Sequence, residues 1–160
     1  MSVKDNFTPQ EWKSLLRAPM LAGYAVAGAA PSKQEDFVRE MAAVADGIGE
    51  GEGRAAKDSL LGMVVADIIA NAEDEQRSQT EKLSTEDVRD RALDTCRTVA
   101  DMLEAKVSPG EAYEYKRWVL VVAERVAGAA KEGGLFDFGG EQISGSEVAT
   151  INDIGEAIRI

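Results

Sequence analysis

Apolar residues recur every three or four positions along most of the chain, and this spacing is typical of amphipathic α-helices. The clearest run marks one face of a long helix with Val88, Ala92, Cys96, Val99 and Leu103. The same spacing predicts helices at about 9–30, 33–45, 54–77, 85–106, 109–131 and 145–158. No segment alternates apolar and polar residues as a half-buried strand does. The sequence therefore predicts an all-α fold.

Capping signals precede most of these predicted helices. In each signal, a Ser or Thr hydroxyl can accept a hydrogen bond from a free N–H of the first turn, and an acid three residues later can accept one from the N–H of the capping residue. Proline follows the cap at Pro9 and Pro109, where its missing N–H costs nothing. The pairs are Thr8 with Glu11, Ser32 with Glu35, Ser84 with Asp87, Ser108 with Glu111, and Ser144 with Glu147.

Three polar or glycine-rich stretches separate the predicted helices. Gly47, Gly49, Gly51 and Gly53 predict a loop, and so does the charge-rich stretch 73–82. The third stretch, 133–140, holds large apolar residues between two glycine pairs.

An internal repeat emerges when the chain is laid against itself with a shift of 100 residues. Residues 8–11 (TPQE) then fall on 108–111 (SPGE), and 26–30 (VAGAA) on 126–130 (VAGAA). We interpret this as a duplicated helical hairpin, about 8–46 and 108–158, with two helices inserted between the copies. The alternative is that capping rules and alanine richness imitate homology. Either way, residues 1–160 are expected to form a single bundle of about six helices.

Charge and composition narrow the functions that this bundle can have. The chain has 29 acidic and 18 basic residues, a net charge of −11, which disfavours binding to nucleic acid or anionic membranes. It has no apolar run long enough to span a bilayer, and its first residues lack the features of a secretory signal. One cysteine, Cys96, cannot form an internal disulfide, so a cytoplasmic location is expected.

The absence of histidine excludes many catalytic sites. Ser-His-Asp and Cys-His hydrolases, histidine-containing di-iron sites and histidine-ligated haem all require that residue. Cys96 lies in the apolar repeat of its helix, so we expect a buried structural thiol. No cofactor and no catalytic residue is predicted, and an enzyme is the less favoured interpretation.

A divalent cation site is conceivable at the predicted glycine loop, where Asp46, Glu50 and Glu52 offer carboxylate oxygens. The loop departs from an EF-hand, because Ile48 occupies a ligand position. Over about ten residues this segment is similar to the acidic loop of tellurite-resistance-type helical domains. The alternative interpretation is a flexible, solvated loop after a helix end.

The glycine-framed stretch 133–140 offers a second candidate site, formed by Leu135, Phe136 and Phe138. These side chains either fold back as a plug over the core or stand out as an anchor for a protein partner. The plug is the favoured alternative.

The C-terminal third resembles a family of small uncharacterised helical proteins of bacteria, cyanobacteria among them. The resemblance rests on the glycine-framed aromatic loop and on Glu111-Ala112, Tyr115-Lys116, Trp118, Val126-Ala127, Lys131-Glu132-Gly133-Gly134 and Ile143-Ser144 with Glu147. It implies a helical fold and no activity.

Three functions remain open at this point. The first is a non-enzymatic protein-interaction or regulatory module that binds a protein partner or a second copy of itself. The second is a divalent-cation-binding domain or a carboxylate-based enzyme. The third is a small-molecule carrier that uses a glycine-lined groove.

Overall fold

The all-α prediction is confirmed. The computed structural model describes residues 2–29, 34–71, 85–132 and 145–160, and these residues form six α-helices, one short 3-10 helix and no strand. The elements are η1 (Val3–Asn6), α1 (Pro9–Ala27), α2 (Gln34–Arg54), α3 (Leu60–Ala70), α5 (Thr85–Lys106), α6 (Pro109–Glu132) and α7 (Gly145–Ile158). No helix in these ranges is both long and apolar enough to cross a membrane.

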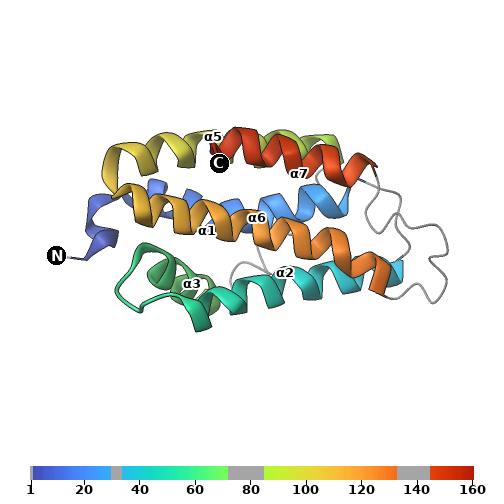
Figure 1. Cartoon of the computed structure of the whole chain (residues 1–160), viewed down its shortest axis with the longest axis horizontal. Helices are drawn as coiled ribbons and strands as arrows, with labels where there is room; N and C mark the ends of the chain where they lie inside the picture. The colour runs from blue at the N-terminus through green and yellow to red at the C-terminus, as the bar shows by residue number, and fades with distance from the viewer. Residues whose placement is uncertain (1, 30–33, 72–84, 133–144) are drawn as a thin grey trace.

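The helices stack in three layers of two (Figure 1). Helices α1 and α6 form the middle layer, α5 and α7 the layer above it, and α2 and α3 the layer below. Helices α1 and α6 run in the same direction and pack directly against each other. Because they are covered on both sides, they contribute much of the core.

The middle pair is joined by a buried hydrogen bond between positions 100 residues apart. The Tyr115 hydroxyl donates to the Leu15 carbonyl at 2.6 Å, and both side chains are fully buried. Trp118 packs edge-on against Tyr115, with the ring centroids 5.8 Å apart. Trp12 and Trp118 are both buried. Burial of each large aromatic or aliphatic side chain contributes about 2 kcal/mol.

Two of the predicted caps lie among the described residues, and in both the hydroxyl accepts the predicted hydrogen bond. The Thr8 hydroxyl accepts from the Glu11 N–H at 3.2 Å, and the Glu11 carboxylate accepts from the Thr8 N–H at 3.1 Å. The Ser108 hydroxyl accepts from the Glu111 N–H at 3.3 Å. The Glu111 carboxylate, however, accepts from the Leu60 N–H at 3.3 Å and so caps α3. The other three pairs include residues outside the described ranges.

The prediction of a loop at Gly47–Gly53 is wrong, because α2 continues through this segment to Arg54. Two of its glycines face α6, and packing there offsets the low helix propensity of glycine. A Cβ at Gly51 would lie 2.8 Å from Nε1 of Trp118, and a Cβ at Gly47 would lie 3.2 Å from the Val122 Cα. The Trp118 indole also donates to the Gly47 carbonyl at 3.0 Å.

Helix α3 is shorter than the predicted helix 54–77. Residues 55–59 form a turn, and Ser59 caps the helix by accepting from the Gly62 N–H at 3.1 Å. A Cβ at Gly62 would lie 2.1 Å from the Ala56 carbonyl oxygen, so only glycine lets the turn close against the helix. The sequence rule missed this start because the third residue after Ser59 is Gly62 instead of an acid.

The duplicated hairpin stays a prediction. Helices α1 and α6 lie parallel in the middle layer, an arrangement that two related copies of one helix can adopt. The helix that follows each of them, however, packs chiefly against another part of the fold, α2 against α6 and α7 against α5. The two segments are therefore not self-contained hairpins.

Candidate functional site

The acidic segment of α2 does not assemble a cation site. Asp46 and Glu52 are exposed, whereas Glu50 forms an ion pair with Arg125 of α6. At 100° per residue, a helix points Glu52 away from the side that Asp46 and Glu50 share. Nowhere in the described ranges do three acidic or cysteine residues gather in a group that could hold a metal ion. The prediction of a metal site assumed that these three residues lie in or beside a loop, whereas the segment is part of helix α2.

The aromatic candidates Leu135, Phe136 and Phe138 lie outside the described residues. The choice between plug and anchor therefore stays a prediction.

The one thiol and its neighbouring phenol are unsuited to nucleophilic chemistry. Cys96 is fully buried in α5, and desolvation raises the pKa of its thiol to about 12. Desolvation also raises the pKa of Tyr115 well above its ordinary value, and the nearby Cys96 adds to the effect. Both groups stay protonated at neutral pH, and a protonated thiol is a poor nucleophile.

Among the described residues two acids are buried, Glu40 in the second turn of α2 and Glu147 in the first turn of α7. The positive end of the helix dipole favours the carboxylate of Glu147. Each of the two is engaged in an interaction within the chain.

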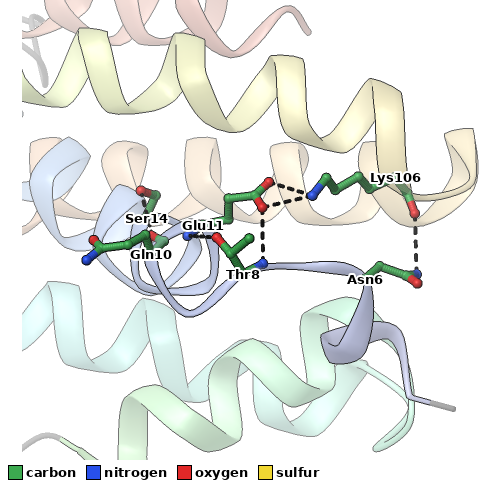
Figure 2. A network of polar contacts seen from close by, with 6 residues as sticks. All are labelled: Asn6, Thr8, Gln10, Glu11, Ser14 and Lys106. Atoms are coloured by element: carbon green, nitrogen blue, oxygen red, sulfur yellow. Dashed lines mark hydrogen bonds and ion pairs between the residues drawn. The ribbon is translucent and has the colours of Figure 1, made fainter.

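A polar network ties the start of α1 to the end of α5 (Figure 2). The Glu11 carboxylate caps α1 and also pairs with the Lys106 ammonium at 2.7 Å. The Lys106 carbonyl accepts from the Asn6 side chain at 3.5 Å. The hydrogen bond from Lys106, followed by the one from Thr8, lowers the pKa of Glu11.

A second network ties η1 and α1 to α3. Asp67 accepts from the Lys4 ammonium at 2.7 Å and from the Trp12 indole at 2.8 Å. Partial burial opposes ionisation of Asp67, but these two hydrogen bonds outweigh it and lower its pKa. Asp67 is the only charged residue of α3, and its carboxylate is bound by these two donors from other elements of the chain.

The outward side of α3 is uncharged, and the sequence analysis did not identify it as a site. Leu60, Leu61, Val64, Val65 and Ile68 are buried against the bundle. The helix geometry puts the opposite side at Ala66, flanked by Gly62, Met63, Ile69 and Ala70. Ile69 is 48% exposed, a large fraction for a residue of its size and hydrophobicity.

Helix α2, which contacts α3, also exposes small residues. Gly49 and Gly53 point opposite to the glycines that contact α6, and a Cβ at either position would meet nothing within 4 Å. Ala42 and Ala45 are exposed on the same side. We call the surface formed by these outward residues the α2–α3 face; it consists of Ala42, Ala45, Gly49, Gly53, Met63, Ala66, Ile69 and Ala70.

The two outer layers differ in the residues that they expose. In the layer of α2 and α3, from Arg39 to Ala70, 8 of the 14 exposed residues have small or apolar side chains, and the other six are three basic and three acidic residues. Among the described side chains of α5 and of 145–160, 5 of the 19 exposed residues are small or apolar. Seven exposed acids outnumber four exposed bases there. The side formed by α2 and α3 therefore exposes a smaller share of charged residues, with acids and bases in equal number, and this makes it a candidate contact surface.

Comparison with protein-family models, with curated proteins and with solved structures finds no match to this chain.

Proposed function

We propose that this protein is a non-enzymatic protein-interaction or regulatory module that binds its partner through the α2–α3 face. The observation that carries the proposal is the uncharged outward side of α3, centred on Ala66, in a chain with a net charge of −11. Contact surfaces are poor in charge at their centre and polar at their rim. Arg54, Lys57 and Asp58 provide such a rim beside the start of α3.

The chemistry of the buried groups supports a binding role over catalysis. The thiol of Cys96 and the phenol of Tyr115 are protonated and enclosed in the core. The carboxylates of Glu11 and Asp67 are occupied by lysine, backbone and indole donors. These groups stabilise the fold, so their roles are accounted for without a substrate.

Capture from lysate with charge-bearing variants tests this proposal. Ala66→Glu places a carboxylate at the centre of the face, and Ala149→Glu places one on an exposed position of α7 as the matched control. We expect a protein captured by the wild type and by Ala149→Glu to be lost with Ala66→Glu. Both variants should melt like the wild type, because each changes an exposed helix position.

Two other outcomes would redirect the proposal. If Ala66→Glu keeps the partner while serine at Phe136 and Phe138 releases it, the binding site is the aromatic loop. If calcium or magnesium raises the melting temperature, the cation-binding alternative gains its first support, because only a ligand of the native state does so.

A further inference from the structure

We propose that the end of α2 is a flap that unfolds locally and uncovers Trp118 while the rest of the bundle stays folded. The flap consists of residues 49–55, which lie between the buried Ile48 and the turn before α3. The inference goes beyond the proposed function, since it requires no partner. It is carried by the composition of the flap, by its fixed ends and by the groups that it covers.

The flap has few attachments to the core. Three of its seven residues are glycine, each of which lowers helix stability relative to alanine, and none of the seven has a large apolar side chain. Within these seven residues only Gly51 is buried. The ion pair of Glu50 with Arg125 is partly exposed, so it is a weak link. Segments with few buried apolar contacts open at a lower free energy than the whole fold.

Both ends of the flap are fixed, so its opening can be confined to it. Ile48 is buried, and beyond the flap the turn closes against Gly62, where an added Cβ would lie 2.1 Å from the Ala56 carbonyl oxygen. As a helix, seven residues span about 10 Å, whereas an extended chain of the same length reaches about 23 Å. The unfolded flap therefore has enough slack to leave α6 without moving either end.

The closed flap covers apolar groups of two neighbouring helices. A Cβ at Gly51 would lie 2.8 Å from Nε1 of Trp118 in α6 and 2.9 Å from a methyl carbon of Val65 in α3. Both side chains are buried. Because the Gly51 backbone lies directly over them, water reaches them when the flap opens. The end of α5 is built differently, because Met102 and Leu103 are buried in its last turns.

Hydrogen exchange measured by NMR as a function of urea tests the inference. We expect the amides of residues 52–55 to exchange through one shared opening that does not depend on urea, because little surface is exposed. Their protection should be at least about tenfold lower than that of residues 103–106 at the end of α5. Protection that falls steadily toward residue 55 indicates ordinary fraying of a helix end and overturns the inference. Equal protection of the two helix ends overturns it as well.

Alanine at the two outward glycines should close the flap. Gly49→Ala and Gly53→Ala together place methyl groups in open space, so protection of residues 52–55 should rise about tenfold. Gly128→Ala in α6 also meets open space and is the matched control, which should leave exchange of the flap unchanged. If the double variant has no effect on the flap, or if the control has the same effect, the flap does not open as a separate unit.

Alanine at the inward glycine should open the flap. The added methyl group at Gly51 collides with Trp118 and Val65, and the weakly attached flap moves away from them. We expect residues 52–55 to lose their protection and the tryptophan emission to shift to longer wavelength, while the amides of α1 and α5 stay protected. Protection that falls evenly through the whole bundle shows that residues 49–55 unfold only with the rest, and it overturns the inference. Unchanged protection and emission contradict it too.

Discussion

The α2–α3 layer and the α5–α7 layer cover opposite sides of the same helix pair, but they are held in different ways. The α2–α3 layer is fitted by close approach, with Gly51 under Trp118 and Gly62 under the turn at Ala56. The α5–α7 layer is joined within itself by exposed ion pairs, Arg89 with Asp153 and Arg159 with Asp101 and Glu104. Steric changes should therefore disturb the first layer most, and salt should weaken the exposed ion pairs that join α5 to α7.

The outer surfaces differ in the same sense. Six of the 14 exposed residues from Arg39 to Ala70 are charged, against 11 of the 19 exposed residues of α5 and 145–160. The contrast teaches that the apolar surface of α3 is not excess core. The inward side of α3 already consists of five large aliphatic residues, and all five are buried.

The largest effect is expected for Gly62→Ala in the fitted layer. A methyl group there would lie 2.1 Å from a backbone oxygen, which cannot move without opening the turn before α3. We expect the free energy of unfolding to fall by about 3 kcal/mol in urea titrations. The matched control Gly53→Ala meets open space and should gain about 0.5–1 kcal/mol. Equal effects of the two variants would contradict the fitted attachment.

The second prediction concerns alkaline pH and the buried thiol of α5. Because folding raises the pKa of Cys96 from 9.0 to about 12, its stabilising contribution is complete below pH 9 and is lost as pH rises toward 12. Tyr115, with a raised pKa, acts in the same direction above pH 10. We expect unfolding free energy to fall above pH 9, with Cys96 contributing a slope of up to about 1.4 kcal/mol per pH unit.

Cys96→Ala should reduce this alkaline slope even though it lowers stability at neutral pH by removing buried sulfur. Tyr113→Phe, which removes an exposed phenol, is the control and should leave the slope unchanged. A slope that is identical in all three proteins would show that the thiol ionises as readily in the folded chain as in the unfolded one.

Local signals predicted most of the fold. The start of α1 could be predicted because Thr8 and Glu11 lie in one turn and complete each other's hydrogen bonds. Helix α5 agrees with its predicted bounds because its charged and apolar positions are cleanly separated. Where the deciding interaction is local, the sequence is enough.

The errors occurred where the deciding interaction is distant. The glycines of α2 were interpreted as a loop because glycine disfavours helix, and Trp118, which offsets this, is 67 residues beyond Gly51. The face of α3 was missed for another reason. Nearly every residue of that helix is apolar, so periodicity cannot tell which side turns inward. Only the packing of α3 against its neighbours separates Ile68, which is buried, from Ile69, which is exposed.

A smaller effect is expected at Asp67, the polar link between α3 and the N-terminal elements. Folding lowers the pKa of this carboxyl, so its contribution is present above its ordinary value of 3.8 and is lost as pH falls below it. Asp67→Asn should therefore cost about 1 kcal/mol at pH 7, because the Lys4 and Trp12 donors lose a charged acceptor. The cost should shrink toward zero when unfolding is measured below pH 3. Asp58→Asn, at an exposed site nearby, should change stability by less than about 0.5 kcal/mol.

The smallest effect is expected at Arg159, where the charged layer combines exposed ion pairs with backbone strain. Its φ of 62° lies in the left-handed region that favours glycine, and the Ile160 N–H closes the helix end by donating to the Gly155 carbonyl at 3.1 Å. Arg159→Ala removes the pairs with Asp101 and Glu104 but keeps the strain. We expect a small loss of stability that disappears in 1 M salt, because exposed pairs are weak and screened.

Arg159→Gly removes the same pairs and the strain together, so it should be about 1 kcal/mol more stable than Arg159→Ala at every salt concentration. In high salt it should equal or exceed the wild type in thermal and urea unfolding. This difference separates the two contributions, since salt acts on the ion pairs and leaves the backbone preference unchanged. Equal stability of the glycine and alanine variants would mean that the left-handed turn costs the folded chain nothing. The ion pairs alone would then account for the choice of arginine at this helix end.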